Sequence, residues 1–179
     1  MSHNKLRIAI CHFHLRTGGV TRVIEHAIEA LADRNVSIAV LTGEAPVKPF
    51  PAGIHCQVIP GLAYEETRTL VDGAELAAQM QTVAADVLGA SPDVWHFHNH
   101  SLGKNLAAPS AIRTLAGDGQ RILLHIHDFC EDGRPALYKR LLSGTADGDQ
   151  GRLSELLYPL AEQIHYAVLN GRDQGNLIR

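Results

Sequence analysis

The sequence predicts an α/β fold: a doubly wound, mostly parallel sheet of Rossmann-like type in a single domain that spans residues 1–179. Short apolar runs rich in branched residues, of a length typical of buried strands, recur along the chain. Between them lie segments in which apolar residues recur at helical spacing. Strands that alternate with helices form a mostly parallel sheet with helices on both faces.

The first strand and helix enclose a glycine turn. An apolar run begins at Ile8, and Val20, Ile24 and further apolar residues recur afterwards at helical spacing. Gly18 and Gly19 lie between them, where backbone N–H groups at a helix start can face an anion and a ligand can come close. A purely structural turn fits the two glycines equally well. The turn lacks the G-x-G-x-x-G of dinucleotide sites and the Lys-Ser/Thr of a P-loop, which excludes both of those common sites.

The remaining elements follow in alternation. Strands are expected at residues 36–41, 54–59, 94–98, 121–127 and 165–170, and helices at 65–88 with a break at Gly73, 106–115, 136–142, 153–163 and 172–179. The third strand alternates apolar and polar residues, which suits the edge of the sheet. The predicted strand order is therefore 3-2-1-4-5-6, with ligands binding between strands one and four, where that order reverses.

Composition and charge limit the classes of protein to which this chain can belong. A formal charge of −3 without a concentrated basic face gives no reason to expect nucleic acid as a partner. The three cysteines lie far apart, as is typical of reduced thiols in the cytoplasm. The N-terminus lacks a signal peptide and no apolar run is long enough to span a membrane, so we expect a cytoplasmic protein. The segment 139–142 (Lys-Arg-Leu-Leu) suits a solvated helix face or weak peripheral contact with the inner membrane face.

Histidines are the unusual feature, with eleven in the chain. Seven fall at the carboxyl ends of strands one, four and five, which are neighbours in the predicted order, so we expect them to converge on one rim. Side chains two apart share a face of a strand. The members predicted to be hydrogen-bonded in the core are His12, His96 and His125, and those predicted to reach the ligand crevice are His14, His98 and His127; His100 follows the fourth strand.

A metal site is the main alternative for these histidines. Imidazole is the commonest transition-metal ligand, and Asp128, Glu131 or Asp132 could complete a coordination shell. However, H-E-x-x-H is absent and no carboxylate lies inside the histidine triplet of residues 96–100, so we predict no metal site. Serine hydrolysis is also disfavoured, because there is no G-x-S-x-G elbow.

Four features together resemble a known family. They are the first-strand loop with Gly18-Gly19, Asp93-Val94-Trp95-His96-Phe97-His98-Asn99, Leu124-His125-Ile126-His127-Asp128-Phe129, and Ala167-Val168-Leu169-Asn170 leading into a helix. In this order they resemble the N-terminal domain of retaining glycosyltransferases of the GT-B fold, family four. The resemblance covers the whole chain.

The resemblance implies roles for individual residues. In that family the N-terminal domain binds mainly the acceptor, a C-terminal domain binds the sugar nucleotide, and reaction occurs between them. By position, Gly18 and Gly19 resemble the loop that touches the donor diphosphate, and His127 resembles the histidine that contacts the transferred sugar, so it is the catalytic candidate. The residues expected on the acceptor and sugar side are His14, His98, Asn99, His100 and Asp128.

The implied reaction needs no cofactor and no metal, because a helix dipole and basic groups carry the charge that a divalent ion carries elsewhere. The implied partners are a nucleotide sugar and a sugar or lipid-linked acceptor. The donor-binding domain of the family has no counterpart in this chain, so the chain resembles an N-terminal half that we expect to be inactive alone. Asn170 stands where a serine is common, and His100 has no counterpart that we can place. A non-catalytic Rossmann-type module that binds a nucleotide or sugar and a histidine-rich metal hydrolase are the alternatives.

Overall fold

The computed structural model describes residues 5–50, 53–64 and 72–177. Six parallel strands form one sheet in the order β3-β2-β1-β4-β5-β6. The strands are β1 (Leu6–His12), β2 (Val36–Thr42), β3 (His55–Val58), β4 (Val94–His98), β5 (Ile122–Ile126) and β6 (Ile164–Val168). The helices are α1 (Gly19–Leu31), the short 3-10 helix η1 (Pro60–Leu62), α2 (Gly73–Leu88), α3 (Ala107–Gly117), α4 (Pro135–Thr145), α5 (Gln150–Leu157) and α6 (Gly171–Leu177).

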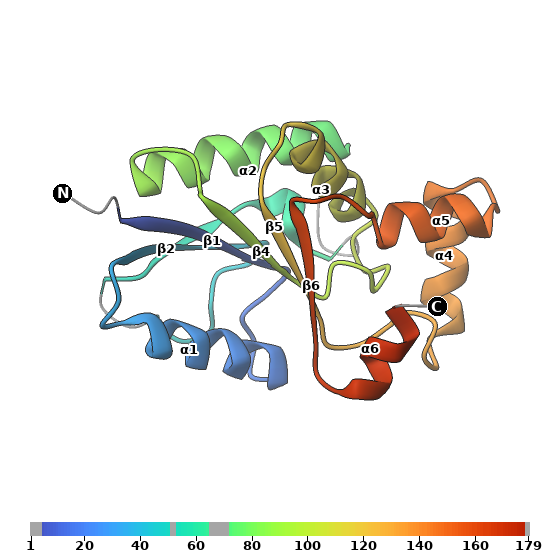
Figure 1. The fold of residues 1–179 in the computed structure, drawn as a ribbon, viewed down its shortest axis with the longest axis horizontal. Helices are drawn as coiled ribbons and strands as arrows, with labels where there is room; N and C mark the ends of the chain where they lie inside the picture. Colours follow the sequence, from blue (N-terminus) through green and yellow to red (C-terminus); the bar gives the residue numbers. More distant parts are fainter. Residues whose placement is uncertain (1–4, 51–52, 65–71, 178–179) are drawn as a thin grey trace.

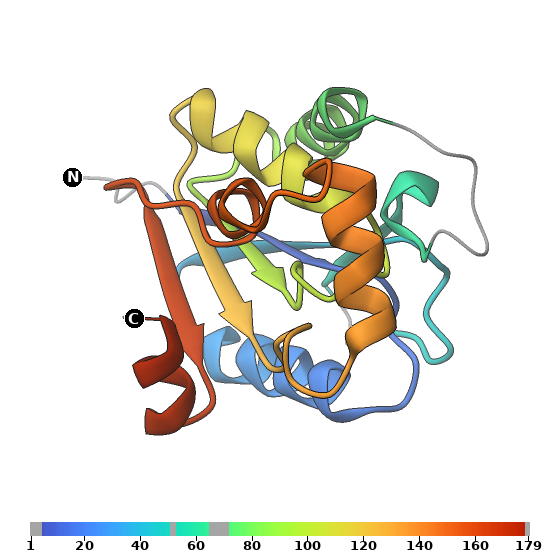
Figure 2. The same ribbon diagram turned by 90° about the vertical axis from the view of Figure 1, so that its right-hand side faces the viewer.

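The predicted doubly wound fold and its strand order are confirmed. The strand β3 lies at one edge, and neither its first nor its last residue is buried, as its alternating sequence indicates. Helices α2 and α3 cover one face of the sheet, and α1 and α6 lie on the other (Figure 1). Helix α5 packs against α3 and α4 (Figure 2), at the end of the molecule away from β1 and β2 (Figure 1). Within the described residues, no helix is long and apolar enough to cross a lipid bilayer.

The larger core lies between the sheet and helices α2 and α3. Trp95 and Phe97 of β4 point into it and pack with Leu124 of β5 and with apolar residues of α2 such as Met80. Trp95 is fully buried, and its indole N–H donates to the side-chain oxygen of Gln120 at 3.0 Å, so its one polar group is satisfied.

The start of helix α2 is determined by an N-cap residue and by close packing against α3. The Asp72 carboxylate accepts the backbone N–H of Glu75 at 2.7 Å, as an N-cap does. A Cβ at Gly73 would collide with the side chain and backbone of Ser110 in α3, so glycine permits the two helices to touch. The sequence predicts a helix from residue 65 with a break at Gly73; the described helix starts at Gly73, and residues 65–71 lie outside the described part.

Boundaries differ most in the second half of the chain. Helix α4 runs to Thr145, three residues past its predicted end, and α5 covers 150–157 where 153–163 was predicted. The cause is a cap: the Asp149 carboxylate accepts the N–H of Arg152 at 3.0 Å and starts α5 early. Helix α3 keeps Pro109 in its first turn, where no intrahelical N–H is needed.

Candidate functional site at the carboxyl ends of the strands

A cavity of about 180 Å³ opens at the carboxyl ends of β1 and β4, where the strand order reverses. Its walls come from the loop between β1 and α1, the loop after β4 and the loop after β5. The lining residues are His12, His14, Arg16, Gly18, Gly19, Val20, Thr21, Tyr64, Asn99, Leu102, Lys104, Asp128 and Arg134. A cavity therefore lies at the position where the strand order predicts ligand binding.

The glycine turn leaves the amino end of α1 open toward this cavity. A Cβ at Gly19 would meet no atom within 4 Å, and one at Gly18 would meet only the carbonyl of Arg16 at 3.9 Å. No side chain caps the helix and its first turn holds no acidic residue. The start of a helix carries partial positive charge and N–H donors, so this end of α1 favours an anion. Arg16 at the rim is held by Glu44 through hydrogen bonds of 2.7–3.1 Å.

Two further cations reach the cavity from the other loops. The Lys104 ammonium lies 4.5 Å from the centre of the Tyr64 ring, and Arg134 forms an ion pair of 3.2 Å with Asp128. Among the described lining residues, Asp128 is the one carboxylate, against Arg16, Lys104 and Arg134. Glu44 pairs with Arg16 and Asp128 pairs with Arg134, so Lys104 and the helix end are what make the cavity electropositive.

Asn99 holds the loops after β4 and β5 in place. Its backbone has a φ of 56°, a left-handed conformation that asparagine tolerates better than most residues. Its side-chain oxygen accepts the backbone N–H groups of His127 at 2.7 Å and of Asp128 at 3.1 Å. Asn99 is 3 % exposed and also lines the cavity, so it sets the position of Asp128 there.

Two histidines of the first strand end form part of the wall. His14 Nε2 lies 3.0 Å from the Tyr64 hydroxyl, while its Nδ1 is buried with no hydrogen-bond partner among the described residues. Burial, and then the charge of Arg16, lowers the pKa of His14. His12 Nδ1 lies 3.2 Å from the His98 carbonyl, and burial lowers the pKa of His12 to about 4. The His12 ring is therefore neutral at pH 7.

Three predicted site residues do not line the cavity. His98 is 2 % exposed, and its Nδ1 lies 2.9 Å from Nε2 of His127. His100 is 1 % exposed, and its Nε2–H donates to the carbonyl of Leu157 at 2.7 Å. The rings of His98 and His127 pack together because both side chains follow the face of the sheet that their strands dictate instead of turning over the strand ends. The structure thus brings together His14, Gly18, Gly19, Asn99 and Asp128, without His98, His100 and His127.

The cationic side chains of this site, Lys104 and Arg134, were not among the residues predicted from the sequence. Lys104 and Arg134 each directly follow a glycine in a loop after a strand, and this pattern could have identified them from the sequence. Tyr64 carried no such signal, because it enters from the segment after β3 and η1.

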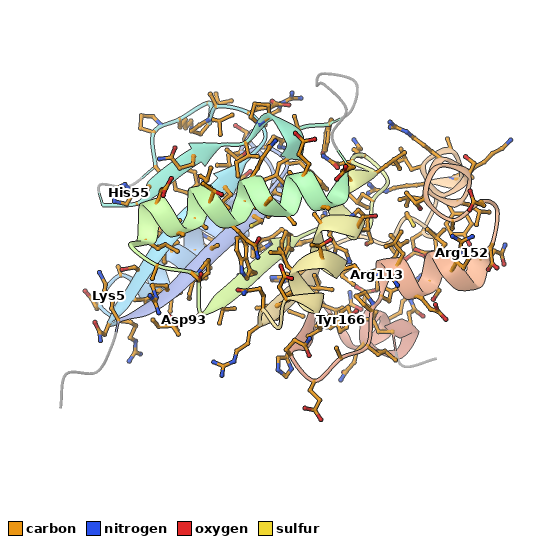
Figure 3. The ribbon with its side chains drawn as sticks, turned by 90° about the horizontal axis from the view of Figure 1, so that it is seen from above. Lys5, His55, Asp93, Arg113, Arg152 and Tyr166 are labelled. Atoms are coloured by element: carbon orange, nitrogen blue, oxygen red, sulfur yellow. The ribbon has the colours of Figure 1, made fainter. Side chains whose placement is uncertain are left out.

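A larger hollow, about 680 Å³, lies between α3 and α5 and is lined in part by Arg113 and Arg152, which Figure 3 labels. The exposed Arg152 is already paired with Asp147 at 2.9 Å. The smaller cavity is the better candidate, because it sits at the strand ends beside a helix start.

Comparisons with known proteins give distant matches among solved structures. No protein-family model matches the chain, and no curated protein matches its sequence. Among solved structures, apo UGT2 of Phytolacca americana is 12% identical, with a TM-score of 0.41 over 70% of this chain and 30% of that one. The same UGT2 complexed with UDP-2-fluoro-glucose and pterostilbene is 14% identical, with a TM-score of 0.40 over 73% and 32%. The TubZ protofilament from bacteriophage PhiKZ is 13% identical, with a TM-score of 0.43 over 97% and 54%.

The chain therefore spans between about a third and about a half of the length of these structures. They are distantly similar in their α/β arrangement, which proteins of different function share. Membership of glycosyltransferase family four stays a prediction.

Proposed function

We propose that this chain is the N-terminal, acceptor-side half of a retaining GT-B glycosyltransferase that moves a sugar from a nucleotide-sugar donor to a sugar or lipid-linked acceptor. The observation that supports it is the electropositive cavity at the open end of α1, walled by Gly18, Gly19, Lys104 and Arg134. An anion of the size of a diphosphate, approaching at the glycine turn, would meet backbone N–H groups and two cations.

The chemistry asked of this half is charge stabilisation and positioning. As the bond from sugar to diphosphate breaks, negative charge builds on the leaving group, and preorganised donors lower the barrier because they need not reorganise. The helix start, Lys104 and Arg134 would supply that stabilisation. The charge that a divalent ion balances elsewhere is met by these groups, so we propose that the transfer step uses no metal.

His14, Asn99 and Asp128 would face the acceptor and the transferred sugar from the same cavity. The catalytic role of His127 rests on the resemblance alone, because its ring is paired with His98; contact with a sugar would require the ring to turn away. We propose that the donor nucleotide is held mainly by a second domain. The chain alone should therefore bind anions at this cavity but transfer no sugar.

The experiment is a titration of the ¹⁵N-labelled chain with pyrophosphate, followed by NMR. The amide signals of Gly18, Gly19 and Val20 should shift, and a Lys104→Met/Arg134→Met variant should bind at least ten-fold more weakly. Arg113→Met/Arg152→Met, which removes two cations at the other hollow, is the matched control and should bind like the unaltered chain. Shifts that avoid the glycine turn, or equal affinity in both variants, would refute the proposal.

A further inference from the structure

Four histidines cluster on the side of the sheet that faces α1. Trp95 and Phe97 point into the core under α2 and α3, so His96 and His98, which alternate with them on β4, point the other way. On β5, Leu124 points into the same core, which places His125 and His127 beside them. The register pairs His98 directly with His125. Two neighbouring strands thus bring four imidazoles together beside the cavity described above, where the ring of His12 lies 6.3 Å from that of His98.

The rings are spaced as metal ligands are. Two nitrogens bound to a tetrahedral Zn²⁺ at about 2.0–2.1 Å lie roughly 3.3–3.4 Å apart. His96 Nε2 and His125 Nδ1 lie 3.4 Å apart. One ring nitrogen from each of His96, His98 and His125 falls within 4.8 Å of the other two, so an ion would need the third ring to move inward by about an ångström.

An unpartnered nitrogen gives independent support. His98 is 2 % exposed, and its Nε2 is buried with no hydrogen-bond partner among the described residues. A buried polar atom without a partner is unfavourable, and a bound ligand would relieve it. The other nitrogen, Nδ1, lies 2.9 Å from His127 Nε2. If Nδ1 donates to His127, the lone pair of Nε2 is left free, which is the arrangement by which a neighbouring group orients a metal-binding histidine.

We propose that His96, His98 and His125 bind one transition-metal ion of the Zn²⁺ type, and that His127 positions His98. Three imidazoles without thiolate or carboxylate select Zn²⁺, Co²⁺, Ni²⁺ or Cu²⁺ over Mg²⁺ and Ca²⁺. His96 and His125 are only partly buried, which gives an ion a path to the site. We expect a water molecule to take the fourth position. The proposal departs from the sequence-based expectation of no metal site, which looked for a motif within one segment. It does not rest on the anion cavity of the proposed transferase, but it assigns the His127 ring to His98 instead of to a sugar.

The test uses the whole chain, stripped with a chelator and titrated separately with ZnCl₂ and CoCl₂. We expect one ion per chain by calorimetry, visible absorption typical of tetrahedral Co²⁺, and a higher Tm with zinc. His96→Gln and His125→Gln should each weaken zinc binding more than ten-fold. His127→Gln should weaken it by roughly 10–100-fold and keep the stoichiometry, as loss of an orienting partner does.

The control is a His26→Gln/His55→Gln variant, which removes two exposed histidines from α1 and β3. It should bind zinc like the unaltered chain. Circular dichroism establishes that each variant is folded; His96 and His125 are only partly buried, so their changes should leave the fold intact. Zinc affinity of the unaltered chain equal to that of His96→Gln and His125→Gln would overturn the proposal, as would loss of binding in the control.

Discussion

The two faces of strands β4 and β5 use alternate residues of the same two segments, yet they differ in chemistry. Toward α2 and α3, Trp95, Phe97 and Leu124 are at most 3 % exposed and form part of a dry core. Toward α1, the rings of His96 and His125 stack with an interplanar angle of 4°, and those of His125 and His127 with an angle of 23°. One face is built of apolar side chains and the other of imidazoles.

The two faces contribute differently: the apolar face stabilises the fold, and the histidine face holds the side chains that can act chemically. Burial of aromatic and branched side chains stabilises the sheet through the α2 and α3 face, so the opposite face can hold polar rings at some energetic disadvantage. That disadvantage is visible in the pKa values: burial lowers the pKa of His96 and of His127 to about 4, with further lowering by neighbouring histidines.

Mild acid should have the largest effect, and it acts through the histidines. Burial lowers the pKa of His12 and of His100 to about 4, against 6.5 for an ordinary histidine. Between these values the unfolded chain binds more protons, so stability is full above about pH 6.5 and falls as the pH drops toward 4. Each histidine contributes up to about 1.4 kcal/mol per pH unit, and the two together a loss on the order of 6 kcal/mol at pH 4.

Urea unfolding at several pH values measures this loss. In His100→Gln the slope of unfolding free energy against pH should be shallower by about 1.4 kcal/mol per unit. A stability that stays constant between pH 7 and pH 5 would contradict the account of neutral, buried rings.

Trp95→Ala tests the opposite face. The change removes a fully buried ring and leaves Gln120 without its indole partner, so we expect a loss of about 3–5 kcal/mol in unfolding free energy. His125→Ala, on the half-buried face of the neighbouring strand, should lose about 1 kcal/mol or less. Chemical denaturation of both variants at pH 7.5 makes the comparison, and equal losses would show that the two faces contribute alike.

Gly19→Val should change the cavity more than the fold. A Cβ there meets no atom within 4 Å, so Tm should fall by only a few degrees, while affinity for pyrophosphate drops because the side chain fills the approach to α1. Gly43→Val is the contrast: its Cβ would collide with the backbone of Ala63, and we expect a much larger loss of Tm. Unchanged pyrophosphate binding in Gly19→Val would show that the glycine turn is not part of the anion site.

The smallest effect is expected at the amino end of the sheet. Arg7 pairs with Asp93 at 3.1 Å; Figure 3 shows Asp93 at the end of the molecule opposite Arg152. The Arg7 partner lowers the pKa of Asp93. Both side chains are about 30 % exposed, so Arg7→Met should lower the stability only slightly, and less in high salt. A loss as large as that expected for Trp95→Ala in denaturation experiments would indicate a buried pair instead.

The sequence alone determined the architecture, because its signals are local. Apolar runs and helical periodicity predicted the sheet, the alternation of residues 54–59 placed β3 at the edge, and Gly18-Gly19 marked the start of α1 beside the cavity. Helix ends were less predictable, since the Asp149 cap that starts α5 competes with a glycine-rich segment that reads as a loop.

Only the tertiary structure decided which histidines line the cavity, which cluster on β4 and β5, and which one is buried beside α5. The alternation of histidines along a strand shows which side chains share a face of the sheet. It does not show which of the two faces the helices cover. The register of β4 with β5 set His98 against His125 and His127, and the placement of α5 buried His100 beside the Leu157 carbonyl. Likewise, Tyr64 and Lys104 meet at the cavity from separate loops. Such contacts depend on distances across strands, which are fixed when the whole sheet and its helices pack, and no single segment encodes them.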